Sequence, residues 1–406
     1  MQSRRNFIGK VAGGLAGSFA ASNVLGANDR IRVGIIGPGD RGKEILRQAL
    51  ALENVDCIGA ADVYTRRLEE AKAIAPNAKT YLDYRRLLED RDIDAVLIAT
   101  PQHLHADCFT AALDAGKHVY QEKTMAFTVA HAKRMRAAYQ RAGSKRVVQI
   151  GHQATSSGQF PDAAGFLQPE LMGKITFIHG HMFRNTPHGK PQWARQIYPD
   201  MTPANIVWKS FLGEAPDHAF DANRYLNWRF FWDYSGGNVY ENMCHQIAFW
   251  YKAMGLGIPN KVTMTGGLYL WKDGREVPDT MAVSMVHSGQ HSGDLLFTWD
   301  SGFGNERLSV TEDVLGDNGT ISRTPQSVRY LPEKKTRPDG NEMAGMTKAD
   351  PKAHMQNFLD NIRGASQQLA CPFDLGFRVA IACRMAVESY RQERTVRWDA
   401  AKEEIV

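Results

Sequence analysis

Short runs of β-branched and other apolar residues alternate with helical patterns through the first 150 residues. Four of these runs have the length of a buried strand, and they cover residues 31–36, 56–61, 95–99 and 118–123. A continuous apolar run of this kind is typical of a parallel strand that is covered on both faces. The alternation of such strands with helices and short loops predicts a doubly wound parallel sheet.

The second half of the chain has a different pattern. Strand and loop signals extend from residue 174 to about residue 328, and a helical tail follows at 352–395. We therefore expect a dinucleotide-binding domain over residues 28–150 and a separate α+β domain over residues 151–406 that includes the tail.

The composition is that of an ordinary globular chain. Of the 406 residues, 43% are hydrophobic and 23% are charged, which excludes a disordered or collagen-like chain. The net charge is +5 without a dense run of Lys and Arg, so we do not expect nucleic acid as a partner. After residue 30 no apolar stretch approaches the ~18 residues that a membrane span needs, so we expect none beyond the N-terminal segment.

The spacing of cysteine and histidine gives no sign of a disulfide framework or of a metal site. The five cysteines are widely spaced and contain no C-x-x-C pair, so we expect them to be small buried side chains. His179, His181 and His188 are close in sequence but lack the spacing of a zinc motif, and we expect no metal ion.

Residues 1–27 have the pattern of an export signal. Arg4 and Arg5 form a twin arginine, and a weakly hydrophobic stretch rich in Ala and Gly follows over 11–24. An amphipathic first helix is the alternative interpretation, but the glycines within 9–17 disfavour it. We therefore expect the twin-arginine translocation (Tat) machinery to export the protein to the periplasm.

Such export would constrain the cofactor. Tat substrates cross the membrane already folded, and the periplasm has no pool of nucleotides. A dinucleotide in this protein would therefore be loaded in the cytoplasm and held tightly. The absence of a disulfide pattern fits folding before export.

A glycine-rich turn follows the first predicted strand. Its six residues are Gly37, Pro38, Gly39, Asp40, Arg41 and Gly42. In the motif G-x-G-x-x-G, the first glycine permits the turn, the second admits a pyrophosphate and the third lets helix and strand pack closely. The unpaired N–H groups of the following helix then face the phosphates. The motif predicts a dinucleotide site that includes Asp40 and Arg41.

An acidic residue at the end of the second strand distinguishes the two nicotinamide dinucleotides. Asp62 stands twenty residues after Gly42 and can accept hydrogen bonds from ribose hydroxyl groups. Its charge repels a 2′-phosphate, which favours NAD over NADP. Arg66 and Arg67 follow closely and would tolerate a phosphate, so NADP is the less favoured alternative.

Two further motifs stand at the ends of the third and fourth strands. One runs from Thr100 and Pro101 to His105, and the other is the pair Glu122 and Lys123. With the glycine turn, these residues resemble the Gfo/Idh/MocA (glucose–fructose oxidoreductase/inositol dehydrogenase) family, and the resemblance covers nearly the whole chain after the N-terminal segment. It implies that the first motif lies beside the adenosine and the nicotinamide. It also implies that the lysine of the second contacts both the nicotinamide ribose and the substrate.

The second half carries the same resemblance. A helical pattern after Gly236 and Gly237 contains Glu241 and His245, and in the family an aspartate lies four residues before a histidine that faces the substrate. The i, i+4 spacing places both side chains on one face of a helix. The chain departs from the family in having glutamate at this position and Thr124 after the lysine, where proline is usual. These departures indicate a reshaped pocket.

Aromatic and arginine side chains in the second half are suited to a carbohydrate cleft, because aromatic faces stack on sugars and guanidinium groups bind hydroxyls. The candidates are Trp193, Arg195, Arg224, Tyr225, Trp228, Arg229 and Trp232. The alternative is a core stripe with exposed guanidinium groups. In the family the second domain has a large, mainly antiparallel sheet that is open on one face, and the resemblance implies a homodimer or homotetramer.

The residues and the resemblance together indicate NAD-dependent oxidation or reduction at a hydroxyl or ketone of a sugar or sugar derivative. His245 would accept the carbinol proton, Lys123 would stabilise the developing alkoxide, and Glu241 would orient His245 or a neighbouring hydroxyl. A second hypothesis is a redox-neutral glycosidase that uses bound NAD as a recycled catalyst, as exported relatives of the family do. A third is a scaffold protein with a vestigial Rossmann domain, which the intact glycine motif argues against.

Overall fold

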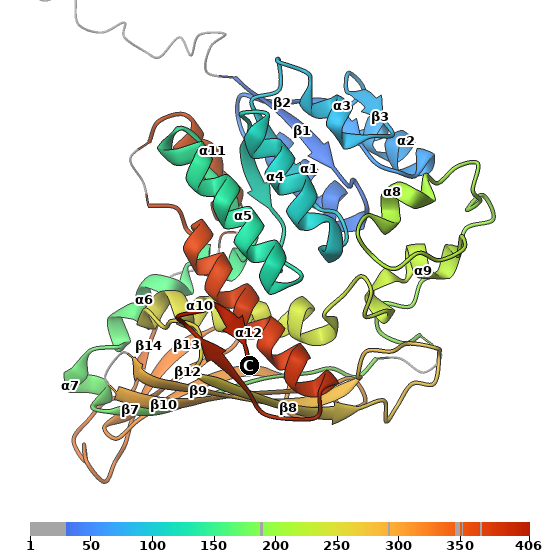
Figure 1. Cartoon of the computed structure of the whole chain (residues 1–406). Coiled ribbons are helices and arrows are strands. Elements are labelled where there is room, and N and C mark those ends of the chain that lie inside the picture. Colours follow the sequence, from blue (N-terminus) through green and yellow to red (C-terminus); the bar gives the residue numbers. More distant parts are fainter. Residues whose placement is uncertain (1–29, 187–189, 291–292, 346–349, 351, 366–367) are drawn as a thin grey trace, which may run out of the picture.

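A computed structural model describes the chain from residue 30 to residue 406, except for residues 187–189, 291–292, 346–349, 351 and 366–367. The expected export segment and His188 lie outside the described residues. The described part contains two sheets, one from each half of the chain, with helices between and around them (Figure 1).

The first sheet has six parallel strands in the order β3-β2-β1-β4-β5-β6. The strands are β1 (Ile31–Ile36), β2 (Val55–Ala61), β3 (Lys79–Tyr81), β4 (Ala95–Ile98), β5 (His118–Gln121) and β6 (Val148–Ile150). The main helices around them are α1 (Asp40–Leu50), α2 (Thr65–Ile74), α3 (Tyr84–Leu88), α4 (His105–Asp114) and α5 (Val129–Ala142). The strand order reverses between β1 and β4, where such sheets bind their ligands. The predicted doubly wound parallel sheet is confirmed.

Both faces of this sheet are buried, which explains why its strands are apolar at successive positions. Val33 and Ile35 belong to the core on one face, whereas Ile36 belongs to the core on the other. Successive side chains of a strand point to opposite faces, so a strand covered on both sides needs apolar residues at nearly every position.

The second sheet has ten strands in the order β14-β13-β12-β11-β7-β10-β9-β8-β15-β16. They are β7 (Ile175–Phe183), β8 (Lys261–Gly267), β9 (Thr280–Gln290), β10 (Gly293–Gly302), β11 (Val310–Gly316), β12 (Gly319–Arg323), β13 (Val328–Pro332), β14 (Met343–Ala344), β15 (Val396–Asp399) and β16 (Glu404–Ile405). Among the described pairings, β7 with β10 is parallel and the others are antiparallel. The expected α+β domain with a large, mainly antiparallel sheet is confirmed.

Helices α10 (Cys244–Met254) and α12 (Phe373–Arg391) cover one face of the second sheet and separate it from the first domain (Figure 1). One apolar core runs from the first sheet through these helices to the second sheet. The first helix of the tail, α11 (Ala353–Ile362), instead packs against α1 and adds Phe358 to the core of the first sheet. The two domains are therefore joined by extensive apolar packing.

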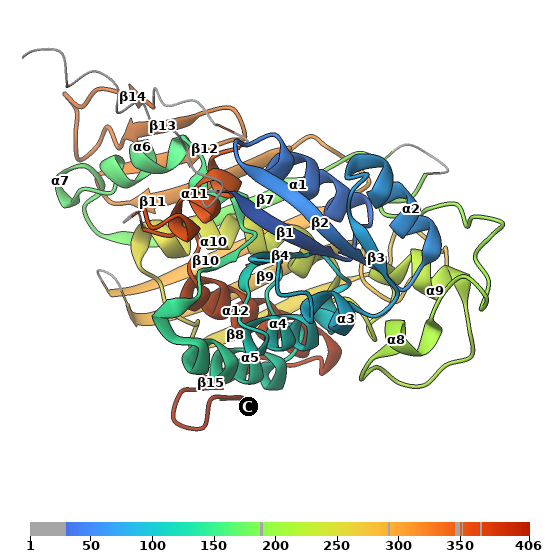
Figure 2. The ribbon, with the colours of Figure 1, turned by 90° about the horizontal axis from the view of Figure 1, so that it is seen from above.

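A segment of the second half extends back to the first domain. We call residues 195–229 the wall segment; it includes α8 (Trp208–Leu212) and α9 (Ala222–Leu226) and lies near α2 (Figure 2). The backbone N–H of Val207 donates to the carbonyl of Val63 at 2.9 Å, and that of Thr65 donates to Asn205 at 3.1 Å. These hydrogen bonds attach the wall segment to the chain immediately after β2.

The cysteines are small buried side chains, as the sequence predicted: all five are buried and unpaired. They are Cys57, Cys108, Cys244, Cys371 and Cys383. Within the described residues, no three His, Cys, Asp or Glu side chains are arranged to hold a metal ion. Nor does any helix in the described part have the length and apolar character needed to cross a membrane.

Candidate active site

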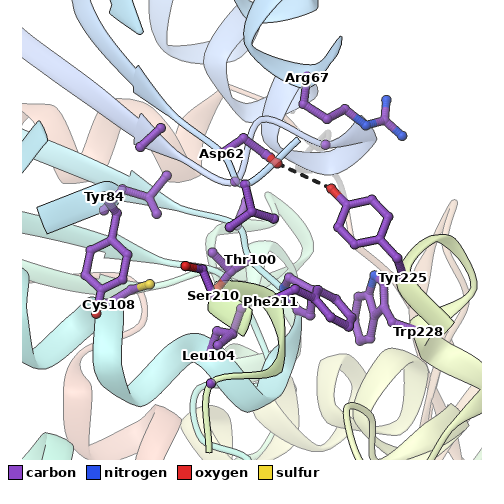
Figure 3. A pocket seen from close by; sticks show the side chains of 18 of the residues that line it. Asp62, Arg67, Tyr84, Thr100, Leu104, Cys108, Ser210, Phe211, Tyr225 and Trp228 are labelled. Carbon is purple, nitrogen blue, oxygen red and sulfur yellow. Dashed lines mark hydrogen bonds between the residues drawn. The ribbon is translucent and has the colours of Figure 1, made fainter. Parts of the chain in front are cut away.

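A cavity of about 790 Å³ lies at the carboxyl ends of the parallel strands, between the first domain and the wall segment. Figure 3 shows Asp62 and Thr100 on one side of it and Phe211, Tyr225 and Trp228 on the other. The predicted cofactor-binding residues that line it are Gly37, Gly39, Asp40, Arg41, Asp62, Thr100 and Pro101. The structure thus brings residues from three strand ends into one site.

The three glycines of the turn differ in what a side chain at each position would contact. Gly37 has φ +81°, and a Cβ there would lie 2.8 Å from the backbone nitrogen of Thr100. A Cβ at Gly42 would clash with the carbonyl oxygen of Gly37. A Cβ at Gly39 would meet no protein atom within 4 Å, and α1 begins at the next residue without a side chain capping its N–H groups. Open space before an uncapped helix N-terminus fits a pyrophosphate.

Asp62, at the end of β2, fits the ribose position that the sequence predicted. Its Oδ1 accepts hydrogen bonds from the backbone N–H of Tyr64 at 2.9 Å and from the hydroxyl of Tyr225 at 3.3 Å. Burial raises the pKa of Asp62 to about 6, and these hydrogen bonds oppose the shift only in part. Ribose hydroxyl groups would donate to the ionised carboxylate, so ribose binding and ionisation favour each other.

Asp40 joins the two sides of the cavity. Its carboxylate forms an ion pair with Arg195 of the wall segment, and it also lies 3.2 Å from Arg67 and 3.6 Å from Lys43. Burial acts to raise the pKa of Asp40, but the three cations outweigh it and the net pKa is lowered. The carboxylate is therefore ionised at the N-terminus of α1, where negative charge is favoured.

Glu122 positions its neighbours from behind the cavity. Its Oε1 accepts hydrogen bonds from Arg41 at 2.9 Å and from Gln153 at 3.2 Å, and its Oε2 accepts from the backbone N–H of Lys123 at 3.1 Å. The Glu122 side chain is almost fully buried and does not line the cavity. It fixes the glycine turn to the loop that carries the lysine.

Asp200 holds the wall segment against the first domain. Its carboxylate accepts a hydrogen bond from the hydroxyl of Tyr64 at 2.8 Å and two from the guanidinium of Arg66 at 2.7 and 3.0 Å. Arg67 is engaged in turn by Glu70 at 2.7 Å. Carboxylates thus bind both arginines that would tolerate a 2′-phosphate, which agrees with NAD as the cofactor.

Lys123 and Glu241 form an ion pair that does not itself line the cavity. The ammonium of Lys123 donates to Oε2 of Glu241 at 3.1 Å and to its carbonyl oxygen at 3.1 Å. Arg229, which lines the cavity, lies 3.2 Å from the same Oε2, and Gln102 donates to Oε1 at 2.7 Å. The pair therefore adjoins the cavity through Arg229.

The charges of this pair stabilise each other. Burial would raise the pKa of Glu241, but Arg229 and Lys123 outweigh it and hold the pKa at about 2. Burial would lower the pKa of Lys123, but the carboxylate of Glu241 outweighs it and the net pKa is raised. Both groups are therefore ionised at neutral pH, as an electrostatic stabiliser of an alkoxide requires.

The expected contact between Glu241 and His245 is replaced by the contact with Lys123. Val239–Met243 form a π-helical turn (η6) immediately before α10. Within the described structure the hydrogen bonds and ion pairs of the Glu241 carboxylate go to other groups. Of the two expected roles of Glu241, orienting His245 is corrected to orienting Lys123, and orienting a neighbouring hydroxyl stays a prediction.

His245 lies near Lys123, in ring contact with a second histidine. Its ring centroid is 5.8 Å from that of His152, with the ring planes at 84°. Burial, together with the charge of Lys123, holds the pKa of His245 well below its ordinary value. The sequence led us to expect a base with a pKa near neutrality. The structure instead gives a neutral imidazole that can accept a proton but whose charged form is disfavoured.

His105 does not line the cavity. It is buried at the start of α4, where its ring nitrogens lie 2.9 Å from the carbonyl oxygen of Thr124 and 3.0 Å from that of Thr100. It thus connects the loops that follow β4 and β5. Its expected place beside the cofactor is corrected to a position behind these loops.

Of the seven aromatic and arginine candidates for a carbohydrate cleft, four line the cavity: Arg195, Tyr225, Trp228 and Arg229. The hydroxyl of Tyr225 contacts Asp62, so the structure brings it to the cofactor side of the site. The other three pack within the second half of the chain: Arg224 against Asp233, Trp232 against Tyr390 and Trp193 against Phe303. Four of the seven candidates therefore share one cavity, and Trp193, Arg224 and Trp232 lie outside it.

Two residues of the site, Gln102 and His152, were not identified from the sequence. Gln102 donates to Glu241 and accepts a hydrogen bond from the backbone N–H of Gly236 at 2.9 Å. His152 follows β6 and contacts His245. Each comes soon after the carboxyl end of a parallel strand, and that position is the signal that could have identified both.

The first domain matches a known family of proteins. Residues 31–152 match a family model described as "Oxidoreductase family, NAD-binding Rossmann fold". An inositol 2-dehydrogenase of Salmonella typhimurium is 32% identical over 170 residues, which is 41% of this chain and 50% of the relative. A glycosyl hydrolase family 109 protein of Shewanella baltica is 37% identical over 110 residues, which is 25% of this chain and 24% of the relative. The matches thus span half, or less, of the length of these curated relatives.

A solved structure matches both domains. A levoglucosan dehydrogenase in complex with NADH and levoglucosan aligns over 91% of this chain and 99% of its own, with a TM-score of 0.67 and 19% identity. At this identity the likeness concerns the fold alone. The arrangement of a Rossmann domain and a large second sheet is therefore that of a known structure.

Proposed function

We propose that this chain, whose first domain matches the model of the Gfo/Idh/MocA family of oxidoreductases, oxidises a hydroxyl of a sugar or sugar derivative, or reduces the matching ketone. The observation that carries the proposal is the ionised Lys123–Glu241 pair close to a neutral His245, which Arg229 connects to a cavity that fits a dinucleotide. The inositol 2-dehydrogenase relative supports a polyol-like substrate.

The first domain is an NAD-binding Rossmann domain, and its own residues define how NAD would be held. The turn at Gly39 and the N-terminus of α1 would bind the pyrophosphate, and Asp62 would bind a ribose. When bound, NAD supplies the hydride acceptor. The ion pair of Asp40 with Arg195 and the contacts of Asp200 enclose this site, which supports a tightly held cofactor.

Lys123, Glu241 and His245 would together transfer the proton and stabilise the charge that it leaves behind. An alcohol near pH 7 is too weak an acid to ionise by itself, so a base must take the carbinol proton as the reaction proceeds. The neutral imidazole of His245 is that base. The ammonium of Lys123 would donate a hydrogen bond to the same oxygen and stabilise its developing charge. Glu241 keeps this ammonium charged and in place.

The test begins with the purified protein. Denaturing it should release NAD, and a screen of sugars and polyols should then find one that changes the absorbance of the nicotinamide. Replacing Lys123 with Ala should leave the NAD content unchanged and lower turnover by about 100-fold or more, because an electrostatic stabiliser of the reacting oxygen is lost. The control Lys72→Ala, an exposed lysine on α2, should turn over normally. Normal turnover of the Lys123 variant would count against its assignment.

A second candidate function is a redox-neutral glycosidase with bound NAD. The match to a glycosyl hydrolase family 109 protein favours it. Transient oxidation of the sugar would acidify the neighbouring C–H, the leaving group would be eliminated, water would add, and the sugar would be reduced again. An aryl glycoside distinguishes the two candidates: the glycosidase releases the phenol without net change in NADH absorbance.

Export and assembly are part of the proposal. The twin arginine at Arg4 and Arg5 supports export to the periplasm by the Tat machinery. Replacing both arginines with lysine should leave the protein in the cytoplasm. A homodimer or homotetramer is supported by the second sheet, whose helices α10 and α12 cover one face only in the described part. Light scattering of the purified protein measures the mass of the assembly and so tests the number of subunits.

A further inference from the structure

His152 is unusual among the buried histidines of the described chain. Its side chain is fully buried, and neither ring nitrogen has a hydrogen-bond partner within the described residues. Every other buried histidine there has at least one such bond: His103, His105, His181, His287 and His354. A buried polar group without a partner destabilises a fold, so its presence calls for a partner from outside the chain.

The backbone of His152 is fixed next to the reacting groups. Its N–H donates to the carbonyl of Ile150 at 2.8 Å, and its own carbonyl accepts from the N–H of Thr155 at 3.0 Å. The preceding Gly151 allows a close approach to Glu122, because a Cβ there would lie 3.0 Å from Oε1. The end of β6 is thereby packed against the end of β5.

The ring of His152 contacts the ring of His245, the proposed base. The centroids of the two imidazoles of His152 and His245 lie 5.8 Å apart with the planes at 84°. Lys123 lies close enough for its charge to disfavour protonation of both. Three polar groups from three elements, the loop after β5, the loop after β6 and α10, therefore meet at one place.

We propose that His152 is a substrate-binding residue that hydrogen-bonds the hydroxyl next to the one engaged by His245 and Lys123. The proposal rests on the proposed function, and it specifies the substrate as a compound with hydroxyl groups on neighbouring carbons. Because the two imidazole rings are in contact, the hydroxyl groups that they bind would lie on neighbouring carbons. The substrate hydroxyl would supply the partner that the chain does not.

The protonation state of His152 suits this role. Burial and the charge of Lys123 lower the pKa of His152 to about 3, so its ring is neutral at neutral pH. A neutral imidazole has one nitrogen that donates and one that accepts a hydrogen bond. A hydroxyl group also both donates and accepts, so either tautomer of His152 can bind it.

The test compares His152→Leu with a matched control, His354→Leu. His354 is equally buried but hydrogen-bonds Ser156 at 2.6 Å and the carbonyl of Ile150 at 2.9 Å. We expect His354→Leu to lower the melting temperature of the NAD-loaded protein. His152→Leu should leave the melting temperature unchanged or raise it, because it removes an unpartnered polar group. His152→Gln keeps a donor and an acceptor and should restore part of the binding that the leucine variant loses.

Binding is measured with defined probes. Glucose, its 2-deoxy, 3-deoxy and 4-deoxy analogues, and myo-inositol are added to the NAD-loaded protein, and the shift in melting temperature is followed. The wild type should prefer a probe over the analogue that lacks the neighbouring hydroxyl. His152→Leu should lose this preference, bind the parent compound about tenfold more weakly and keep its NAD content.

Each outcome decides the matter. The assignment is overturned if His152→Leu lowers the melting temperature as His354→Leu does while the preference among probes persists. A structural role or a bound water would then account for the unpartnered ring nitrogens of His152. The assignment is also overturned if none of the probes stabilises the wild type. A protein that binds probes through His152 but holds no NAD and oxidises no sugar contradicts the proposed function and leaves the His152 assignment intact.

Discussion

The ammonium of Lys123 lies 3.1 Å from Oε2 of Glu241, and the two side chains are 12% and 9% exposed. Their backbones are 118 residues apart in sequence, in different domains. A pair this deeply buried is favourable only when both partners are present, because either charge alone would remain desolvated without compensation. The pair therefore links the stability of the domain contact to the protonation state of the site.

Acid should remove this contribution. The pKa of Glu241 is about 2 in the folded protein against an ordinary value of 4.5, so the carboxylate stabilises the fold above pH 4.5 and loses this effect as the pH falls toward 2. The loss amounts to about 3 kcal/mol. The free energy of unfolding, measured with urea, should therefore fall more steeply between pH 5 and pH 3 for the wild type than for Glu241→Gln.

At pH 7 the wild type keeps the full stabilisation from this ion pair. Glu241→Gln should be less stable than the wild type by about 3–5 kcal/mol, because Lys123 and Arg229 remain without the carboxylate. Glu89→Gln, an exposed glutamate that pairs with Arg86 on the surface, is the control and should change stability by less than about 0.5 kcal/mol. Parallel pH profiles for wild type and Glu241→Gln would exclude a stabilising role for the pair.

The fold could be predicted where its signals are local. The run at 31–36 became β1 residue for residue, because a strand covered on both faces must be apolar throughout. The pairing of β15 with β8 could not be predicted, since it joins Val396 to Val262 across the whole second domain. The packing of α11 on the first sheet likewise depends on contacts such as that of Phe358, for which the local pattern gives no direction.

The candidate site divides in the same way. The glycine turn and Asp62 follow from spacing within one strand–turn–helix unit, and the structure brings them into one cavity. The contact of Glu241 with Lys123 could not be predicted, because it joins side chains 118 residues apart in sequence, and the local pattern gives no direction for such a contact. Trp232 lies outside the cavity for a related reason: its side chain suits sugar binding, but tertiary packing directs it to Tyr390.

Gly39 offers a selective way to prevent cofactor binding. Its φ of −65° suits any residue, and a Cβ there meets no protein atom within 4 Å. Gly39→Val should therefore fold with a nearly unchanged melting temperature in the NAD-free form but contain little or no NAD, since the side chain fills the place of the pyrophosphate. The nucleotide released on denaturation is the measurement.

Gly37→Ala is the contrasting variant. Here φ is +81°, and the added Cβ would lie 2.8 Å from the backbone nitrogen of Thr100, so the fold itself should be destabilised by about 1–3 kcal/mol. Normal NAD content in Gly39→Val would show that the dinucleotide does not lie against this turn.

Asp62 should make NAD affinity depend on pH. Its pKa in the free protein is raised to about 6 by burial, and ribose hydroxyls bind the ionised form. Affinity should therefore be constant above pH 7 and fall by up to about tenfold per pH unit below pH 6. Fluorescence titration of the NAD-depleted protein with NADH measures this dependence.

The variant Asp62→Asn serves as the control for this titration. It should bind NADH more weakly at pH 7.5 and show little change between pH 5 and pH 7.5, because an amide does not titrate. If both proteins gave the same pH profile, the dependence would have to come from another group.

Asp200 should control how long the cofactor stays bound. Its carboxylate accepts two hydrogen bonds from Arg66 and one from Tyr64, and it thereby holds the wall segment over the cavity. Asp200→Asn should weaken the charge-assisted contacts and release NAD several-fold faster during dialysis, with the rest of the site unchanged. The control Asp217→Asn changes an exposed residue of the same segment and should retain NAD as the wild type does. Equal rates of NAD loss from all three proteins would mean that the wall segment does not limit release.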